Sequence, residues 1–372
     1  MEQVKPGSRL NEILHWVREL GASDLHLQEG KPARYRLEGR LKVVPAETVP
    51  LMNRERLLTL LGETLSDGVM ADIARKAEVD LSLQMDETRW RANFSKQQGR
   101  QSCSFRVVPK HGLRLKDLRL PVTLRDVLKL PRGLVLLTGP TGQGKSTTVR
   151  ALLQEINATQ AKRIITIEDP IEFLFDDDLS QFEQREVGID TASFADGIRN
   201  AMRQDPNVIF VGEIRDRESI FAAMQAAETG HLVFTTLHAD SVAQAVGRIR
   251  EYYPASEQDN ISSLLARNIN MIVCQRLVPD AEDKLIPCLE ILQRDPTIQD
   301  AIVKNELNRL TEILEVCNHQ GMHSFDQYLI ELMAAGVVTQ ATARTYAVNR
   351  HRLEMLIAGY QSSQSILLPE RR

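Results

Sequence analysis

A glycine-rich segment at residues 139–146 constrains this chain most, because it matches the pattern G-x-x-x-x-G-K-[ST]. The apolar run 134–138 precedes it, and the helix-compatible stretch 147–157 follows it. In that context the glycines let the backbone wrap a phosphate with its N–H groups turned inward, and the helix N-terminus adds the positive end of its dipole. A glycine-rich turn without a ligand is the alternative, but the strand–loop–helix order predicts a nucleotide-phosphate site.

Two side chains of this segment carry the predicted chemistry. Lys145 is expected to bridge the β- and γ-phosphates of a nucleotide, and Ser146 is expected to ligate the Mg²⁺ that accompanies it. The other predicted nucleotide-binding positions are Gly139, Pro140, Thr141, Gly142, Gln143, Gly144 and Thr147.

The middle of the chain predicts a parallel sheet. Four short, nearly continuous apolar runs lie at 134–138, 163–167, 208–211 and 232–236. Strands that are buried on both faces have this composition. Helical stretches such as 147–157 and 219–228 lie between the runs, and this alternation indicates βαβ units.

Polar residues follow these predicted strands, at the sheet edge where ligands bind in open parallel sheets. Glu213 follows one strand and can hold the Mg²⁺ water shell or act near an attacking water. Glu172 follows another, within the carboxylate-rich segment 166–172, and can orient that water. His231 and His238 bracket a third strand. For each of these residues an ordinary structural role stays open.

Composition excludes several classes of protein. The 372 residues predict roughly two domains. Lys and Arg number 46 against 50 Asp and Glu, a net charge of −4, which disfavours a nucleic-acid binder. No secretory signal and no apolar run long enough to span a bilayer is visible. The four cysteines are widely scattered, which fits reduced thiols in a cytoplasm.

The two ends of the chain predict different architectures. In the first third, Ser8 can cap a helix, period-two alternation predicts strands, and a helical stretch is expected over 54–75. The strand segments lie near 35–37, 81–85, 90–94 and 103–107. The segment 109–121 is basic and is bounded by prolines, which predicts a linker between domains. An ordinary surface loop is the alternative. The last ~90 residues are expected to be helical, with Ser324 as a helix cap.

Four segments resemble, in order and spacing, the motifs of the secretion ATPase superfamily. Residues 139–146 resemble its Walker A motif, 167–172 its Asp box, 205–213 its Walker B motif and 227–238 its His box. Within this superfamily the chain resembles the PilT/PilU type IV pilus retraction ATPases over nearly its whole length. Residues 21–26 and 321–327 also look like segments of that family.

The resemblance implies an α/β fold with a PAS-like α+β N-terminal domain and a RecA-like P-loop ATPase domain followed by C-terminal helices. The boundaries expected are 1–110 for the first domain, 111–121 for the linker, 122–290 for the ATPase core, 291–360 for the helical region and 361–372 for a flexible tail. It also implies a homohexameric ring that hydrolyses ATP with Mg²⁺ and drives pilus retraction and twitching motility.

The resemblance also implies roles for individual residues. Glu172 is the expected catalytic base and Glu213 the Walker B acid, while His231 and His238 are expected near the nucleotide and the subunit interface. Arg91 and Arg106 of the first domain, with Arg203 as a further candidate, are expected to reach the phosphates. An exposed arginine without catalytic function is the alternative for each.

Partners and subtype follow from the same resemblance. The expected location is the cytoplasmic face of the inner membrane, with the pilus platform protein and a paralogous retraction ATPase as partners and no nucleic acid. Segments 289–301, 322–327 and 349–360 look closer to PilU than to PilT. Gln143 stands where the family commonly has Ser, and it is expected to contribute mainly its backbone. An accessory ring subunit and a type IV secretion ATPase stay open as alternatives.

Overall fold

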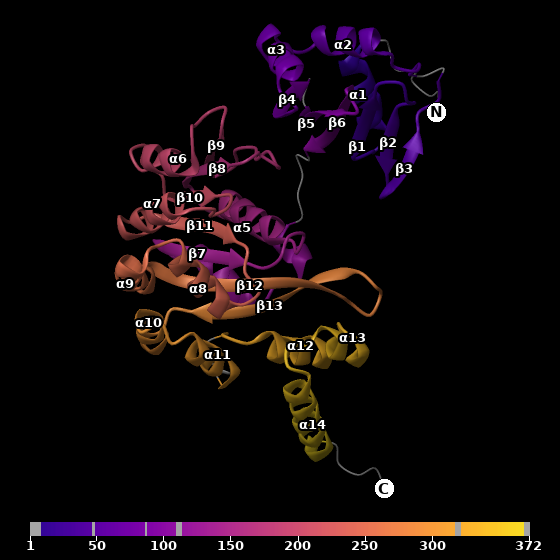
Figure 1. Cartoon of the computed structure of the whole chain (residues 1–372). Helices are drawn as coiled ribbons and strands as arrows, with labels where there is room; N and C mark the ends of the chain where they lie inside the picture. Colours follow the sequence, from indigo (N-terminus) through magenta and orange to yellow (C-terminus); the bar gives the residue numbers. More distant parts are fainter. Residues whose placement is uncertain (1–8, 47–48, 86–87, 109–113, 317–320, 368–372) are drawn as a thin grey trace. The chain divides into compact units, whose positions relative to one another are not determined.

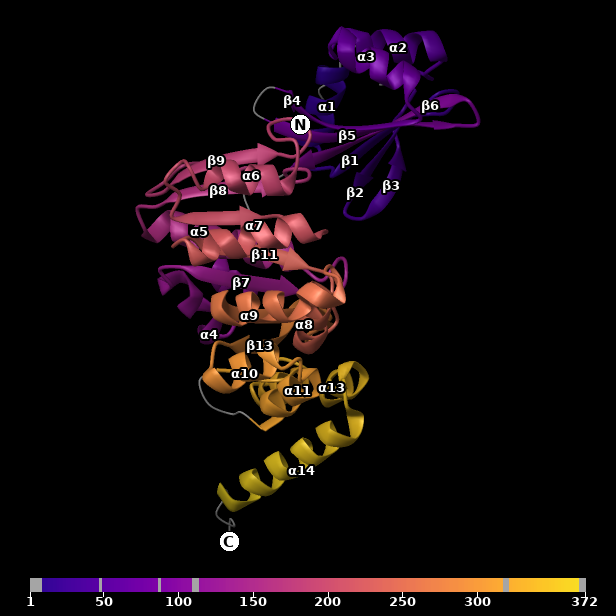
Figure 2. The same cartoon turned by 60° about the vertical axis from the view of Figure 1, so that its left-hand side comes forward.

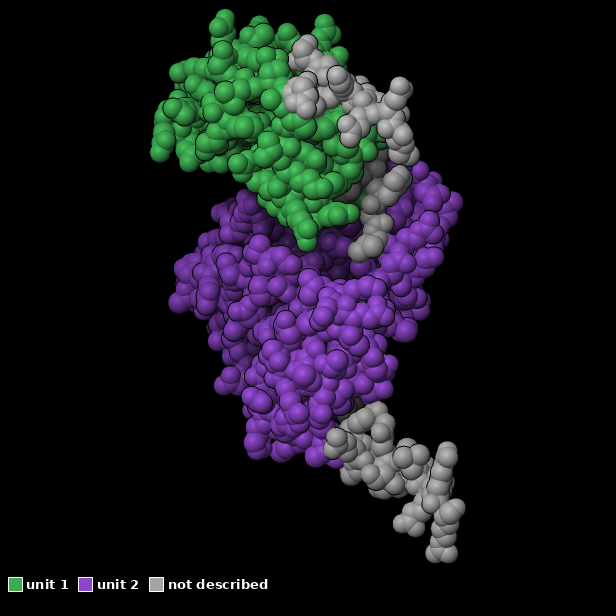
Figure 3. Space-filling view, turned by 90° about the vertical axis from the view of Figure 1, so that its right-hand side faces the viewer, with its two compact units in different colours: residues 1–111, 170–174 green, residues 112–169, 175–372 purple. Residues whose placement is uncertain are grey.

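The computed structural model describes residues 9–46, 49–85, 88–108, 114–316 and 321–367, with side chains described as far as residue 359. The chain divides into two compact units, shown in two views in Figures 1 and 2. One unit is Met1–His111 with Pro170–Leu174, and the other is Gly112–Asp169 with Phe175–Arg372 (Figure 3). Ser8, Cys317, residues 111–113 of the predicted linker and the end of the predicted tail lie outside the described residues.

Over its described residues, the smaller unit is a six-stranded antiparallel sheet with three helices, and its strand order is β3-β2-β1-β6-β5-β4. The strands are β1 (Asp24–Gln28), β2 (Arg34–Leu37), β3 (Arg40–Val43), β4 (Glu78–Met85), β5 (Thr88–Gln97) and β6 (Arg100–Val108). The helices are α1 (Leu10–Glu19), α2 (Arg54–Gly62) and α3 (Asp67–Arg75). The predicted stretch over 54–75 is therefore two helices, because α2 ends at Gly62 and Ser66 begins a new one.

Alternation along the strands gives this sheet one apolar face. Trp90, Phe94 and Phe105 are almost fully buried in a core that they share with the apolar residues of α1. Because successive side chains of a strand point to opposite faces, Arg91 and Arg106 lie on the other, polar face.

The larger unit contains a seven-stranded sheet in the order β13-β12-β7-β11-β10-β8-β9. The predicted parallel strands are confirmed as β7 (Gly133–Thr138), β8 (Arg163–Glu168), β10 (Val208–Val211) and β11 (Leu232–Leu237), and the sheet also includes the parallel strand β9 (Gln181–Glu186). Every residue of β7, β10 and β11 is buried, as expected for strands that are covered on both faces. Connecting helices are α5 (Lys145–Thr159), α6 (Phe194–Ala201), α7 (Arg217–Glu228), α8 (Val242–Glu251) and α9 (Gln258–Asn268).

A long antiparallel hairpin completes this sheet, and it corrects one prediction. The hairpin consists of β12 (Ile269–Pro279) and β13 (Leu285–Gln293), and Figure 1 shows it extending beyond the neighbouring strands. The expectation that the last ~90 residues are helical is wrong at β13. Residues 286–292 are all buried, and periodicity alone cannot distinguish such a short apolar run from a buried helix.

Helices dominate the remainder of the chain. They are α10 (Pro296–Val303), α11 (Leu307–Val316), α12 (Phe325–Ala334), α13 (Gln340–Tyr346) and α14 (Arg350–Leu367), the last of which runs past Tyr360. Ser324 caps α12 as predicted, in a reciprocal capping box with Gln327. Within the predicted linker, Leu115 and Leu120 are buried, and the described part belongs to the larger unit. Over the described residues, no helix is long and apolar enough to cross a membrane.

Candidate nucleotide site

The phosphate-loop segment takes the shape that its sequence predicts. It connects the buried strand β7 to α5, and Gly139, Gly142 and Gly144 all have positive φ angles, of 140°, 78° and 78°. A Cβ atom on Gly139 would lie 2.3 Å from the carbonyl oxygen of Gln275, and one on Gly144 would lie 2.9 Å from its Nε2. Glycine is therefore required at both positions, by backbone conformation and by close packing.

Lys145 is the first residue of α5, and its side chain folds back over this loop. Its Nζ donates hydrogen bonds to the carbonyl oxygens of Gly139 at 2.6 Å and Pro140 at 2.9 Å. Burial of the side chain lowers the pKa of Lys145. The ammonium group is therefore held at the loop by acceptors that a phosphate can replace, which is the arrangement that the sequence predicts.

The parallel strand order brings other predicted residues to the same edge of the sheet. Because β7, β11, β10 and β8 are parallel neighbours, their C-terminal ends lie side by side. His238 follows β11, Glu213 follows β10 by two residues, and Asp169 follows β8. This edge therefore combines the loop with a histidine and two carboxylates.

His238 connects the carboxylate of Glu213 with the loop. Its Nε2 lies 3.3 Å from Glu213 Oε2, and its Nδ1 lies 3.4 Å from Thr141 Oγ1 and 3.5 Å from Lys145 Nζ. The two ring nitrogens of His238 therefore contact polar groups on opposite sides of the ring, the Glu213 carboxylate on one side and the loop on the other. Arg215 forms ion pairs with Glu213 and, at 2.8 Å, with Asp169. The acid, the histidine and the loop thus form one polar network.

The residues present fit a magnesium ion that binds with the nucleotide. Mg²⁺ prefers oxygen ligands and is commonly held by one or two carboxylates together with substrate phosphates. Ser146 offers a hydroxyl in the first turn of α5, and the Glu213 carboxylate is linked through His238 to the loop. A pocket of about 600 Å³ lies beside the loop and is lined by Thr141, His238 and Arg248, among others.

Two predicted residues lie at the opposite edge of the same sheet. His231 precedes β11, and its Nδ1 lies 2.9 Å from the carbonyl oxygen of Ala226. Arg203 is exposed in the turn between α6 and β10, where strands also begin. Neither residue is brought to the phosphate loop, so their functional roles stay predictions.

Glu172 belongs to a segment that the fold assigns to the smaller unit. It is exposed between the buried residues Ile171 and Phe173, within Pro170–Leu174. The phosphate loop belongs to the larger unit. The role of Glu172 as catalytic base therefore stays a prediction.

Arg91 and Arg106 are direct neighbours on the polar face of the smaller sheet. They face each other across β5 and β6, and Arg106 faces Asp24 of β1 in the same row. Asp24 Oδ1 accepts a hydrogen bond from Arg106 Nε at 2.7 Å, although the Arg106 side chain is 66% exposed. Burial works to raise the pKa of Asp24, but the Ser23 hydroxyl and Arg106 outweigh it and lower that pKa.

Sequence reasoning missed Asp24, although it lies in segment 21–26, which resembles the family. It also expected Gln143 to contribute mainly its backbone, and that expectation is wrong. The side-chain Oε1 of Gln143 accepts a hydrogen bond from the backbone N–H of Leu277 at 2.6 Å. Leu277 lies in β12, far along the chain, so no local pattern could reveal this contact.

A buried carboxyl group supports the segment that follows His238. Glu290 of β13 accepts a hydrogen bond from the backbone N–H of Val242, the first residue of α8, at 2.7 Å. Burial raises the pKa of Glu290 to about 7, against the opposing effects of that N–H and of Arg276. Asp326 adds to the rise. Glu290 therefore keeps its proton well above the range of an ordinary carboxyl group.

The substitution Glu290→Gln is expected to stabilise the protein above about pH 7 and to lose this advantage below about pH 4.5. Between these values the folded state keeps a proton that the unfolded chain releases, so the free energy of unfolding of the wild type falls as the pH rises. The amide avoids this loss, on the order of 3 kcal/mol, and still accepts the Val242 N–H. Urea unfolding across this pH range measures the gain, and a gain independent of pH would contradict the prediction.

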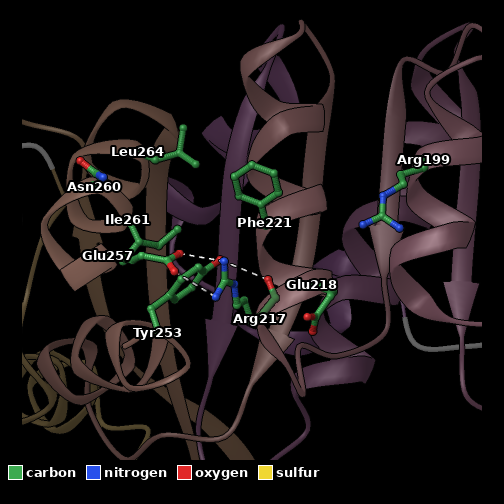
Figure 4. Close-up of a pocket in the computed structure, with 9 residues that line it drawn as sticks. All are labelled: Arg199, Arg217, Glu218, Phe221, Tyr253, Glu257, Asn260, Ile261 and Leu264. Atoms are coloured by element: carbon green, nitrogen blue, oxygen red, sulfur yellow. Dashed lines mark hydrogen bonds and ion pairs between the residues drawn. The ribbon is translucent and has the colours of Figure 1, made fainter. Parts of the chain in front are cut away.

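A second pocket, of about 360 Å³, lies between α7 and α9 (Figure 4). Its apolar side chains are Phe221, Ile261 and Leu264. At its rim, Arg217 stacks over the Tyr253 ring at 5.1 Å and pairs with Glu257 at 2.7 Å. No phosphate-loop residue lines this pocket, so it is separate from the candidate nucleotide site.

Known proteins resemble this chain over most of its length. The family model described as type II/IV secretion system protein matches residues 5–364. The type IV pilus retraction ATPase PilT of Pseudomonas aeruginosa is 34% identical over 91% of this chain and 98% of its own length. The type IV pilus ATPase PilU of the same organism is also 34% identical, over 93% of this chain and 90% of its own. These equal identities do not place the chain nearer to either.

Solved structures agree with these relatives. The crystal structure of the pilus retraction motor PilT with bound ADP matches with a TM-score of 0.84 and 35% identity, over 93% of this chain and 99% of that one. The ATPase DotB of Legionella pneumophila matches with a TM-score of 0.78 and 25% identity, over 96% and 98%. The chain therefore belongs to the type II/IV secretion system protein family, with PilT and PilU as homologues.

Proposed function

We propose that this protein is an ATP-hydrolysing motor that drives type IV pilus retraction, working as a homohexameric ring on the cytoplasmic face of the inner membrane. The observation that carries this proposal is the network in which the phosphate loop, Lys145, His238 and Glu213 meet at one sheet edge. The similarity to PilT supports the cellular role. The inner-membrane platform protein is the proposed partner on which the ring acts, and a paralogous retraction ATPase is a second.

In this proposal the loop amides and Lys145 bind the β- and γ-phosphates of ATP. Mg²⁺, when bound, neutralises phosphate charge, and Ser146 and Glu213 are the residues that would hold it. Glu172 takes the proton of the attacking water, and ADP and phosphate are the products. His238 keeps the Glu213 carboxylate oriented toward the loop. An accessory subunit without hydrolysis of its own would not need this complete set of residues.

A pilus-retraction assay tests the cellular role. A strain that lacks this protein should stop retracting its pili and should lose twitching motility. The wild-type gene should restore both, and a gene encoding Lys145→Ala should restore neither, at equal protein levels. Normal retraction in the deletion strain, in the absence of any paralogous ATPase, would contradict the proposed function.

The substitutions Arg91→Ala and Arg106→Ala are each expected to lower the maximal ATPase rate by roughly 10³-fold. The transition state of phosphoryl transfer spreads charge over the phosphate oxygens and needs cations beyond Lys145. The two arginines are paired neighbours, and Asp24 binds Arg106 through its Nε while that side chain is 66% exposed, so its terminal nitrogens can meet a phosphate. Bringing them to the nucleotide would couple hydrolysis to motion of the smaller unit.

Steady-state ATPase assays at matched subunit concentration measure this effect. Arg40→Ala provides a matched control, because Arg40 is an exposed arginine on the edge strand β3 of the same sheet. If the double variant of Arg91 and Arg106 keeps full activity, the two arginines are solvated surface residues and the proposed coupling fails.

A further inference from the structure

Strand β12 continues past its partner β7 and runs directly behind the phosphate loop. Cys274 is the last β12 residue paired with β7, opposite Thr138. The next three residues, 275–277, pair with β13, and two of them, Gln275 and Leu277, also form hydrogen bonds with the loop. The hairpin and the phosphate loop are therefore in direct contact.

Two glutamines form this contact, which we call the glutamine clasp. The Oε1 of Gln143 accepts the backbone N–H of Leu277 at 2.6 Å, and the Nε2 of Gln275 donates to the carbonyl oxygen of Gln143 at 2.7 Å. The Oε1 of Gln275 accepts from the hydroxyl of Thr148, in the first turn of α5, at 2.8 Å. The clasp thus joins the loop, the helix that follows it and β12.

Packing leaves the clasp little freedom. Gln275 is 1% exposed. Its carbonyl oxygen and Nε2 occupy the space that Cβ atoms on Gly139 and Gly144 would need. A buried donor or acceptor that loses its partner carries the full cost of desolvation, so Gln275 strongly favours this one loop conformation, and the half-buried Gln143 adds its hydrogen bond to Leu277.

Arg276, between Gln275 and Leu277 in β12, connects the clasp to two other segments. Arg276 donates through Nη2 to the carbonyl oxygen of Asp240 at 3.0 Å, two residues beyond His238. Its guanidinium lies 4.6 Å from the centroid of the Phe325 ring, at the start of α12. Displacement of β12 at the loop would therefore reach both the His238 segment and the C-terminal helices.

We propose that Gln143 and Gln275 are positioning residues that hold the phosphate loop in its binding conformation before a nucleotide arrives. Serine cannot replace Gln143 in this role, because its side chain is too short to reach the N–H of Leu277. A loop that is already ordered loses less conformational entropy on binding, so the clasp increases nucleotide affinity rather than the rate of the chemical step. The affinity argument rests on the proposed nucleotide binding at this loop.

Hydrogen exchange of the Leu277 amide in the nucleotide-free, full-length protein tests the clasp directly. Exchange should be at least about tenfold faster in Gln143→Ser than in the wild type, because the variant removes the acceptor of that N–H. Gln143→Glu retains an acceptor at the same position and should restore slow exchange. Equal exchange rates in the wild type and Gln143→Ser would overturn the inference, whether or not the protein hydrolyses ATP.

Titration with ADP tests the positioning role. Gln143→Ser should raise the Kd for ADP by roughly tenfold, while the rate at saturating ATP should change by less than about twofold. Gln154→Ser is the matched control, since Gln154 lies on α5, the helix that follows the loop, outside the clasp. An unchanged Kd together with faster Leu277 exchange would overturn the positioning role. Absence of ADP binding in the wild type would instead contradict the proposed function, and the exchange experiment would still decide the clasp.

Discussion

The substitution Lys145→Ala is expected to abolish ATP hydrolysis and to weaken nucleotide binding. The Lys145 ammonium already lies within the loop, held by the carbonyl oxygens of Gly139 and Pro140. When phosphates occupy the loop, this charge is the one placed to neutralise the β- and γ-phosphates. Alanine removes the charge without introducing bulk, so the fold around the loop should be retained.

ATPase assays together with circular dichroism measure this effect. Hydrolysis should fall to the background rate while the spectrum and the unfolding midpoint stay close to those of the wild type. Lys129→Ala is the control, since that lysine is exposed and forms an exposed ion pair with Asp126. Wild-type turnover in a folded Lys145→Ala protein would contradict the phosphate-site interpretation.

The substitution Glu172→Gln is expected to lower turnover by roughly 10²–10⁴-fold while nucleotide binding stays nearly unchanged. The amide preserves the shape of the side chain but cannot accept a proton from the attacking water. Glu172 is exposed, and its carboxylate can therefore meet a water molecule.

The substitution Glu213→Gln tests which carboxylate, that of Glu172 or that of Glu213, is the catalytic base. Glu213 contacts His238 and Arg215, so its substitution should also weaken magnesium-dependent nucleotide binding. Glu312→Gln, on the exposed surface of α11 and outside the motif segments, is the neutral control. If Glu213→Gln traps ATP and Glu172→Gln turns over normally, the catalytic base is Glu213 and the assignment made here is wrong.

The positions of His231 and His238 show what a strand pattern in the sequence cannot predict. Both bracket β11 in the sequence, and both were expected near the nucleotide. Because a strand carries its two ends to opposite edges of a sheet, only His238 reaches the phosphate loop, whereas His231 lies beside Ala226 at the other edge. Topology separates two residues that the motif groups together.

The sequence by itself determined the phosphate loop, the parallel strands beside it and the alternating strands of the smaller sheet. Each of these depends on local information: glycines at fixed spacing, apolar runs and period-two alternation. These patterns specify the same local structure wherever the apolar side chains are buried, so the sequence alone predicts these elements.

Only the tertiary structure decided the strand registers and the long-range contacts. The pairing of Arg91 with Arg106 depends on the register of β5 and β6, and the glutamine clasp joins Gln143 to β12 across more than 130 residues of chain. Alternation shows that side chains share a face but not which residue lies opposite which. Contacts between distant segments form because the whole sheet packs as one body, and no local pattern in a single sequence encodes that packing.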